Sequence, residues 1–375
     1  MRFQIATKTL KNALDIVNHA VSSISTTPIL ESILIKVNFN NIILTSNNLE
    51  MAIEHVINEN IKIDLEWAFC VPSKIFTNYI SLLWDDDINI ELLLDNSIEL
   101  KTESWNIKIK WNEASDFPLI PNVKENTSFL LNSSVIKKSI EKTLFSRAEW
   151  NIRPTLAWIY ISLEWNKAKF ATTDSFRMSE YKISLDNNFT SNFSQVLPSR
   201  TAFELKNILD DNRKVNVIVW DNQIVFLFEN TKFYSRLLNG KFPDYEWFFP
   251  NSYTTKTIIN RIDLVQALKK VNLISKENNY SIKISFSIED WILIETSQTQ
   301  LWEWKISLVW SIEWEDNIIW LNSEYFLECL WVIETTHVNI SFETPLSPIL
   351  ISPVNDEVNK KSNSSFRHII MPLKI

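Results

Sequence analysis

The sequence almost lacks glycine, with one glycine among 375 residues. Globular chains carry roughly 7% glycine, and hairpin turns depend on it because glycine adopts positive φ angles without strain. A chain rich in β structure can hardly fold without it. We therefore expect other residues to stand at the turn positions of this sequence.

Cysteine and long apolar runs are also scarce. Cys70 and Cys329 lie far apart in apolar segments, and we expect both to be reduced and buried rather than joined in a disulfide or a metal site. The sequence has no run long enough to span a membrane and no signal-peptide pattern, so we expect a cytoplasmic protein. The net charge of −8 excludes a chain that binds nucleic acid with its whole surface, but not one with a single basic face.

Patterns typical of enzymes are missing. The four histidines have no metal-ligand spacing, and neither a phosphate-binding loop nor a nucleophile elbow is present. We therefore expect no catalytic residue, no metal and no cofactor. One alternative is a metal-dependent DNA-processing enzyme with Asp85, Asp86 and Asp87 as metal ligands, although a solvated loop explains that run more simply.

Tryptophan, in contrast, is abundant, with sixteen residues. Many stand beside Asp, Glu or Asn between apolar runs, where glycine is expected: Trp67, Trp84, Trp105, Trp111, Trp165, Trp220 and Trp291. A large aromatic residue would be strained at such turns. We infer that most of these positions are glycine in the cell, because some bacterial lineages read UGA as glycine. The alternative is ordinary buried indoles, and genuine tryptophan at one or two positions, such as Trp247 or Trp331, fits either interpretation.

The chain repeats itself at about one third of its length. Ser73, Ser199 and Ser323 each precede helical apolar spacing, and we interpret them as helix caps spaced by 126 and 124 residues. Alternating strands begin at 32, 158 and 281, and each is followed by a hairpin partner. Amphipathic helices over 7–22, 132–148 and 260–275 open the three units. The spacing predicts three similar domains.

Positive charge gathers on these helices. The opening helices carry Lys8, Lys11, Lys137, Lys138, Lys142, Lys269 and Lys270, and the second helices carry Lys74, Arg200 and Lys206. Solvated helix faces would also be lysine-rich. In an acidic protein, however, lysines on equivalent helices of a repeat favour a basic inner surface and an acidic outer one. A structural interaction protein unrelated to DNA would leave this pattern unexplained.

Several motifs in order resemble the bacterial sliding clamp, the beta subunit of DNA polymerase III. They are Thr27-Pro-Ile-Leu, Ala114-Ser-Asp-Phe-Pro, Arg153-Pro-Thr-Leu, Thr172-Thr-Asp-Ser-Phe-Arg-Met, Arg236-Leu-Leu-Asn-Gly-Lys-Phe-Pro-Asp-Tyr, Pro345-Leu-Ser-Pro-Ile-Leu-Ile-Ser-Pro-Val-Asn-Asp-Glu and Met371-Pro-Leu-Lys. No single motif decides, but their order and spacing cover the whole chain. Trp67, Trp105, Trp111, Trp158 and Trp320 also fall where such clamps usually have glycine.

The resemblance implies an α+β fold with three similar DNA-clamp domains, over residues 1–125, 126–252 and 253–375. Two chains would join head to tail in a six-domain ring, with helices inside and sheets outside. The implied function is that of a non-catalytic processivity factor in DNA replication, an accessory subunit of a DNA-directed DNA polymerase (nucleotidyltransferase) holoenzyme. Implied partners are double-stranded DNA of any sequence, the DNA polymerase III alpha subunit, the clamp loader, repair polymerases, mismatch-repair proteins and a second copy of the chain, but no membrane.

The resemblance also implies site residues. DNA would meet the lysines and arginines named above together with Arg153, although Ile24 stands where an arginine is often found. Partner peptides would enter a pocket formed by Leu156, Thr173, Ser175, Arg177, Met178, Pro243, Phe248, Asn322, Tyr325, Ser347, Ile369, Met371, Pro372 and Leu373. The dimer contact would involve Ile107, Ile109, Leu273 and Ile274. Trp247 replaces a position that is often basic, and without the resemblance the residues 371–373 would be interpreted as a strand end packed on its own core.

Overall fold

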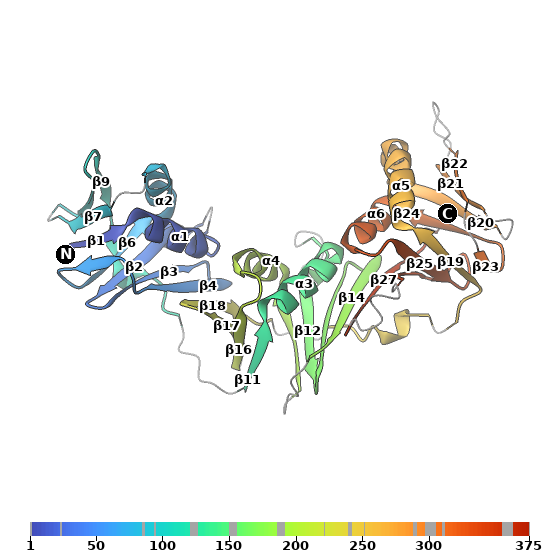
Figure 1. Ribbon diagram of the computed structural model, residues 1–375, viewed down its shortest axis with the longest axis horizontal. Coiled ribbons are helices and arrows are strands. Elements are labelled where there is room, and N and C mark those ends of the chain that lie inside the picture. Colours follow the sequence, from blue (N-terminus) through green and yellow to red (C-terminus); the bar gives the residue numbers. More distant parts are fainter. Residues whose placement is uncertain are drawn as a thin grey trace. The chain divides into compact units, whose positions relative to one another are not determined.

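The computed structural model describes residues 2–22, 25–84, 87–93, 95–120, 127–149, 156–185, 192–220, 222–238, 242–250, 252–287, 291–296, 305–309, 312–354 and 363–374. The chain forms two compact units. The first contains Met1–Ile136 and Arg200–Leu237, and the second contains Lys137–Ser199 and Leu238–Ile375. Antiparallel sheets and α-helices make up each unit (Figure 1).

The described α-helices follow the predicted repeat. Each of the three opening helices is paired along the chain with a shorter second helix. The opening helices are α1 (Thr7–Asn18), α3 (Ser133–Thr143) and α5 (Arg261–Ser275). The second helices are α2 (Ser73–Leu82), α4 (Ser199–Ile208) and α6 (Ser323–Val332). Leu10, Leu14 and Val17 of α1 are buried, as their spacing of three and four residues predicts.

The first unit contains two sheets. A five-stranded sheet has the order β5-β1-β7-β8-β9, and a nine-stranded sheet has the order β10-β6-β2-β3-β4-β18-β17-β16-β11. The strands of the smaller sheet are β1 (Arg2–Ala6), β5 (Ile61–Ile63), β7 (Asp87–Leu92), β8 (Ser97–Lys101) and β9 (Asn106–Lys110). Those of the larger are β2 (Ser32–Asn38), β3 (Asn41–Asn47), β4 (Met51–Ile57), β6 (Trp67–Pro72), β10 (Asn112–Glu113), β11 (Thr127–Asn132), β16 (Lys214–Trp220), β17 (Gln223–Phe228) and β18 (Thr231–Arg236).

The second unit also contains two sheets. Their orders are β15-β12-β13-β14-β27-β26-β25-β19-β23 and β22-β21-β20-β24. The larger sheet contains β12 (Trp158–Glu164), β13 (Lys167–Thr173), β14 (Arg177–Ser184), β15 (Phe193–Pro198), β19 (Thr255–Asn260), β23 (Ile312–Trp314), β25 (His337–Phe342), β26 (Ile349–Pro353) and β27 (Ser364–Ile370). The smaller contains β20 (Ser281–Ser287), β21 (Trp291–Thr296), β22 (Lys305–Val309) and β24 (Asn317–Asn322).

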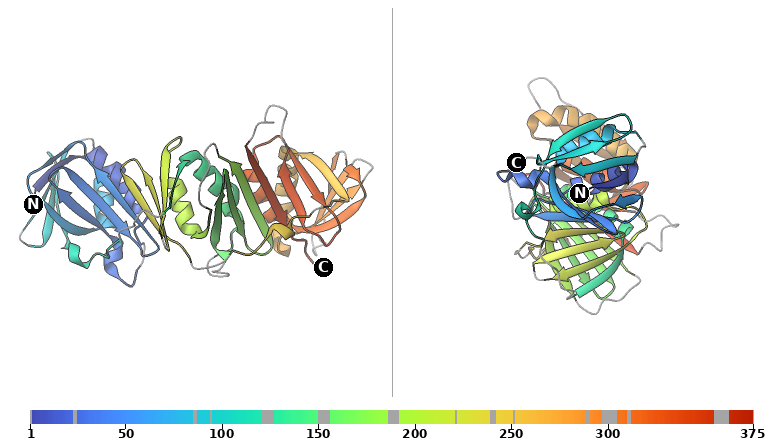
Figure 2. Two further views of the ribbon diagram at one scale, coloured as in Figure 1. Left: turned by 90° about the horizontal axis from the view of Figure 1, so that it is seen from below. Right: turned by 90° about the vertical axis from the view of Figure 1, so that its left-hand side faces the viewer.

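Each nine-stranded sheet joins two successive repeats. In the first unit β4 of the first repeat pairs with β18 of the second, and in the second unit β14 pairs with β27 of the third. Figure 2 shows the strands of the second and third repeats running side by side in one sheet. The two small sheets are the unjoined halves of the first and third repeats, and they end at β9 and β22. β9 is equivalent to β18 and β27, and β22 is equivalent to β4 and β14, which are the strands that pair at the two joints.

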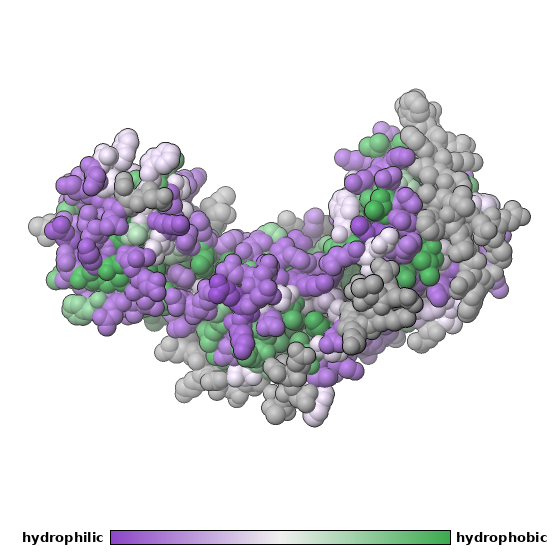
Figure 3. Space-filling view, in the orientation of Figure 1, coloured by the Kyte–Doolittle hydropathy of each residue, from purple (hydrophilic) through white to green (hydrophobic). Residues whose placement is uncertain are grey.

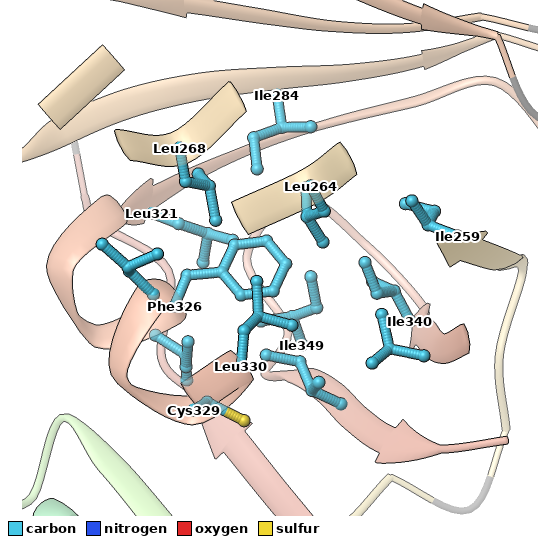
Figure 4. Close-up of a cluster of buried hydrophobic side chains, with 14 of the residues drawn as sticks. Ile259, Leu264, Leu268, Ile284, Leu321, Phe326, Cys329, Leu330, Ile340 and Ile349 are labelled. Carbon is cyan, nitrogen blue, oxygen red and sulfur yellow. The ribbon is translucent and has the colours of Figure 1, made fainter. Parts of the chain in front are cut away.

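The core of the third repeat lies between its two helices and its sheets. Leu264 and Leu268 of α5 point toward Phe326 of α6, which is fully buried (Figure 4). Fully burying each such apolar side chain contributes about 1.5–3 kcal/mol. Asn260 is the N-cap of α5, because its side-chain oxygen accepts hydrogen bonds from the backbone N–H groups of residues 262 and 263.

The capping role predicted for Ser73 and Ser323 is wrong in detail. Ser73, Ser199 and Ser323 are each the first residue of their helix, and all three are buried. The Ser73 hydroxyl donates to Asn18 Oδ1 at 2.6 Å, which ties the second helix to the first. Asn322 caps α6 instead, accepting from the N–H groups of residues 324 and 325.

The tryptophans are not ordinary core residues. Six of the tryptophans that the structure describes are exposed, among them Trp84 at 84% and Trp105 at 64%. Trp165 stands between β12 and β13 with φ 53°, and it is the only tryptophan of the described residues with positive φ. Trp84, Trp105 and Trp111 also lie in connections between elements, but without positive φ, and Trp67, Trp220 and Trp291 begin or end strands. The predicted turn position is therefore found at several described tryptophans, and the positive φ that would demand glycine at one.

Three further expectations concern cysteine, metal and membrane. Cys70 and Cys329 are both buried and free, as predicted, and burial raises the pKa of the Cys70 thiol to about 12. Among the described residues, no group of three or more His, Cys, Asp or Glu side chains could hold a metal ion. Asp87 of the predicted acidic run accepts a hydrogen bond from Gln4 at 2.9 Å, whereas Asp85 and Asp86 lie outside the described residues. No helix in the described part of the chain is long and apolar enough to cross a membrane.

Candidate functional site

A cavity of about 150 Å³ opens in the second unit beside the β13–β14 turn. We call it the partner cavity. Nine of the fourteen predicted pocket residues line it: Leu156, Thr173, Ser175, Arg177, Met178, Pro243, Phe248, Ile369 and Met371. They come from three segments far apart in the sequence, over residues 156–178, 243–248 and 369–371. The pairing of β14 with β27 brings the first and the last together.

The β13–β14 turn that forms one wall is held by its own side chains. Thr173 Oγ1 accepts from the N–H of Ser175 at 3.1 Å, and Asp174 Oδ1 accepts from the N–H of Phe176 at 2.9 Å. Ser175 has φ 79°, which is uncommon for a residue other than glycine. The C-terminal strand then fixes the turn, because the N–H of Met371 donates to the carbonyl of Phe176 at 2.8 Å.

Arg177 is a fixed wall of the cavity rather than a free cation. It is 7% exposed, and its Nε donates to Asp174 at 3.0 Å. Its other nitrogens donate to Glu328 and to the carbonyl of Phe145. The guanidinium also lies 4.1 Å from the ring centre of Tyr325. A planar guanidinium satisfied on every side orients the cavity without offering charge to a ligand.

Sequence reasoning missed two aromatic residues, Phe242 and Tyr245, which also line the cavity. Both stand in the Phe-Pro-Asp-Tyr motif beside Pro243, so the motif could have indicated that they line the cavity too. The Tyr245 hydroxyl donates to the buried Glu180 carboxylate at 2.9 Å. Burial, and after it the Glu180 charge, raises the pKa of Tyr245, so the hydroxyl stays protonated as a donor.

The structure does not place the other five predicted pocket residues on the cavity wall. Asn322 is occupied as the cap of α6, and Ser347 accepts hydrogen bonds in its own turn from the N–H groups of Glu343 and Thr344. Tyr325 does not line the cavity itself but packs against Arg177, which does. The N–H of Leu373 donates to the carbonyl of Trp320 at 2.9 Å, and Pro372 is half-buried before it.

Most of the predicted basic residues lie on helices and are open to solvent. Lys8, Lys74, Lys138, Arg200, Lys269 and Lys270 are exposed, and Lys137 and Lys206 are half-buried. Much of the surface where α3 and α4 lie is hydrophilic in the view of Figure 3. Arg153 and Ile24 lie outside the described residues.

Two lysines on the opening helices have ammonium groups that are engaged by other groups of the protein. Lys142 is 7% exposed, and its ammonium lies 2.7 Å from Glu334. The prediction that Lys142 meets DNA is therefore wrong, because a buried and paired ammonium cannot reach a phosphate. The hydrogen bond from Lys142, together with its charge and that of Lys138, lowers the pKa of Glu334, so the Glu334 carboxylate stays ionised at neutral pH. Lys11 is half-buried and donates to the carbonyl of Leu83 at 2.6 Å.

The predicted dimer residues lie at the ends of the repeat. Ile107 is half-buried and Ile109 buried, both in the edge strand β9. Leu273 near the end of α5 is 78% exposed, and Ile274 beside it is half-buried. Burial of Leu273 against a second copy would remove this apolar surface from water.

Sequence models of one family match nearly the whole chain. The N-terminal domain of the DNA polymerase III beta subunit matches residues 1–121, its central domain residues 130–244 and its C-terminal domain residues 247–374. The chain belongs to the DNA polymerase III beta subunit family. It consists of three β-clamp domains of mixed helix and sheet, as the resemblance predicted.

Individual relatives agree with this assignment. The beta sliding clamp of Bacillus subtilis is 26% identical over 366 residues, which cover 95% of this chain and 97% of the relative. The beta sliding clamp of Streptococcus pneumoniae strain R6 is also 26% identical, over 100% of this chain and 99% of the relative.

Solved structures are similar over the same length. The crystal structure of the polymerase beta subunit from Streptococcus pyogenes has a TM-score of 0.93 and 28% identity, with both chains fully covered. The sliding clamp from Bacillus subtilis has a TM-score of 0.94 and 25% identity, covering 100% of this chain and 99% of that one. The function of this chain is accordingly that of a sliding clamp, a processivity factor of DNA replication.

Proposed function

We propose that two copies of the chain form a head-to-tail ring around duplex DNA and that the partner cavity receives a short peptide from each protein the ring holds. The proposed partners are the DNA polymerase III alpha subunit, the clamp loader, repair polymerases and mismatch-repair proteins. The observation that carries the proposal is the partner cavity itself, where nine predicted residues from three distant segments meet. The ring would act without catalysis, in the cytoplasm.

The chemistry of the partner cavity suits a variable apolar peptide. Met178 and Met371 contribute flexible, polarisable side chains that adapt to different ligands. Leu156, Phe248 and Ile369 complete an apolar lining, and the Thr173 and Ser175 backbone turn is fixed by hydrogen bonds. A rigid frame with adaptable side chains is typical of sites that bind several partners.

The sheet edges support the proposed dimer. In the described part of the chain, β9 and β22 are edge strands at the two ends of the repeat, and they are equivalent to the strands that pair at both joints. Pairing β9 of one protomer with β22 of its partner would repeat the joint between chains and leave neither edge exposed. Leu273 and Ile274 would pack beside this pairing. Six domains, bounded in each protomer at 1–125, 126–252 and 253–375, would then close the ring.

The exposed lysines and arginines on the helices support sequence-independent contact with DNA. Lys8, Lys74, Arg200, Lys269 and Lys270 are open to solvent and come from helices of all three repeats. Such phosphate contacts are screened by salt and carry no sequence information. A ring linked around the duplex needs only weak contacts of this kind, because strong ones would oppose sliding.

Removal of the partner cavity tests the proposal. We expect Met371→Arg, and truncation of residues 371–375, to weaken binding of the polymerase alpha subunit at least about tenfold, because a bulky cation would fill an apolar site of only 150 Å³. Binding is measured by isothermal titration calorimetry. Leu346→Arg is the matched control, since Leu346 is 71% exposed in the same unit and does not line the cavity. Unchanged binding by the Met371 variant would overturn the assignment of the cavity.

A further inference from the structure

We propose that the chain has a second peptide-binding cavity, at the joint between its first and second repeats. A cavity of about 480 Å³ lies there in the first unit, and we call it the second cavity. Leu49, Met51, Leu119, Ile120, Tyr234 and Arg236 are among the residues that line it. None of the DNA, pocket or dimer residues discussed above belongs to it.

The second cavity occupies the same place in its joint as the partner cavity does in the other. Leu49 and Met51 stand 126 residues before Ser175 and Arg177, the period of the repeat. Leu49 has φ 71° and Ser175 has φ 79°, so the turns share an unusual backbone conformation. The N–H of Leu49 donates to Asn47 Oδ1 at 2.8 Å, as the N–H of Ser175 does to the Thr173 hydroxyl.

The facing strand is equivalent as well. The N–H of Arg236, after the last pair of the β4–β18 ladder, donates to the carbonyl of Glu50 at 3.0 Å. In the other joint Met371 makes the same bond to Phe176 at 2.8 Å. Met51 pairs with Ser235 as Arg177 pairs with Ile370. The frame that builds the partner cavity is therefore present twice.

The side chains on this repeated frame are different. The arginine and the methionine exchange positions between the two cavities. Met51 stands where the partner cavity has Arg177, and Arg236 stands where the partner cavity has Met371. Arg177 is buried and paired, whereas Arg236 is exposed and has no ion pair among the described residues. The nearby Glu50 carboxylate accepts from the Thr201 hydroxyl at 3.0 Å. Arg236 is thus the cation that the second cavity can offer to a ligand.

The apolar part of the second cavity is unusually open. Leu119 is 93% exposed and Leu49 is 60% exposed. Leaving large apolar side chains open around a cavity is typical of a binding site. Together with a free arginine, they fit an extended peptide that has apolar side chains and a carboxylate, from Asp, Glu or its own C-terminus, which an arginine binds in bidentate fashion. This inference depends on the proposed function in one respect: that the ligand is a peptide is taken from the proposed role of the partner cavity.

Binding at the two cavities is distinguished by selecting peptides from random octapeptides displayed on phage. The bait is the full-length protein with Met371→Arg, which blocks the partner cavity, and each round is depleted on the same protein with Leu49→Arg added. We expect enriched peptides to combine apolar residues with an acidic group. Their synthetic copies should bind at least about tenfold more weakly to Leu49→Arg and to Leu119→Asp, which both alter exposed side chains and should leave the unfolding midpoint unchanged.

Arg236 supplies the matched pair of variants. Arg236→Gln should weaken binding of the acidic peptides about tenfold, because it removes the charge-assisted bonds to the carboxylate, and Arg236→Lys should weaken it less, because the charge is kept and only the bidentate geometry is lost. The amide form of the peptide should bind wild type and Arg236→Gln equally. No enrichment on the bait, or enriched peptides that bind regardless of Leu49 and Leu119, would overturn the second cavity. The proposed function is tested independently. It would be contradicted if peptides selected on the unaltered protein bound the Met371→Arg variant as tightly as the wild type.

Discussion

Trp165 stands at the tip of the β12–β13 hairpin with φ 53° and a side chain that is 65% exposed. Positive φ costs a residue with a Cβ roughly 1–2 kcal/mol, and glycine adopts it freely. The exposed indole gains little packing in return. Trp105 is equally exposed, at 64%, but its φ is not positive. The two residues therefore differ in backbone conformation rather than in burial.

This contrast gives a direct test of the glycine hypothesis. We expect Trp165→Gly to raise the free energy of unfolding by about 1 kcal/mol and Trp105→Gly to lower it by about 0.5–1 kcal/mol, because glycine relieves strain only at positive φ. Urea unfolding measures both. Peptide mass spectrometry of the protein from its native source would find glycine at position 165 under the hypothesis, and tryptophan there would refute it.

His368 is a second residue whose environment has a measurable consequence. It is fully buried, its Nδ1 lies 2.8 Å from the Ser179 hydroxyl, and its Nε2 has no hydrogen-bond partner among the described residues. Burial, and after it the positive charge of Arg177, lowers the pKa of His368 well below its ordinary value. The folded protein therefore keeps this imidazole neutral.

The sign of the pH dependence follows from that neutrality. Below about pH 6.5 the unfolded chain binds a proton that the folded chain does not, so stability is lost as pH falls from 6.5 toward the lower folded pKa. We expect the free energy of unfolding to fall about 1 kcal/mol more between pH 6.5 and 5.5 in the wild type than in His368→Asn. Parallel curves for the two proteins would show that His368 is protonated in the fold.

At the scale of elements, the two joints share an ion pair across their strands. In the second unit Glu180 of β14 is 1% exposed, and its carboxylate accepts two hydrogen bonds from Arg367 of β27, at 2.8 and 2.6 Å. In the first unit Glu54 of β4 lies 2.8 Å from Lys232 of β18. The latter pair is more open, with 23% and 48% of the side chains exposed.

Burial should decide how much each pair stabilises. We expect Arg367→Met to lower the free energy of unfolding by about 2–3 kcal/mol, because it leaves the buried Glu180 with Lys182 as its only cation among the described residues. The equivalent Lys232→Met should cost less than about 1 kcal/mol, since exposed pairs are screened by solvent. Chemical unfolding compares the two. Glu180→Gln should restore part of the loss in Arg367→Met, and equal losses at the two joints would contradict this account.

The sequence predicted local structure better than long-range contact. Alternating and helical spacing placed the strands and helices of the three repeats within a few residues, because those patterns depend on near neighbours. The pairing of β4 with β18 has no such pattern, and Lys142 meets Glu334 across 192 residues. Phe242 and Tyr245 were missed because they reach the partner cavity only through tertiary packing. Nine pocket residues were found, but by family resemblance rather than by spacing.

At the scale of the whole molecule, the proposed ring depends on closure between two chains. Leu273 is 78% exposed near the end of α5, and Leu82 is equally open at the end of α2, at 77%. Only the first belongs to the proposed interface. A charge at an apolar interface is costly to bury, whereas the same charge in solvent is not.

The proposed ring therefore has a matched test. We expect Leu273→Asp to sediment as a monomer and to be lost from closed circular DNA, and Leu82→Asp to remain dimeric and bound. The wild type should stay on closed circles and escape after linearisation, as topological linkage requires. Sedimentation velocity and gel filtration with loaded circles measure both properties. Retention of a monomeric Leu273→Asp protein on circles would contradict the ring.

The joint of β14 with β27 also bears on how the chain is made. β27 is the last strand of the sequence, and it pairs with a strand that begins 187 residues earlier. During synthesis, the edge of β14 stays open until residues 364–370 have left the ribosome, after which that strand can close the sheet and complete the partner cavity. A prematurely terminated chain would expose an unpaired strand, the kind of surface on which nascent proteins aggregate. The proposed partner cavity can therefore form only once residues 364–371 are available, long after β14 has been made.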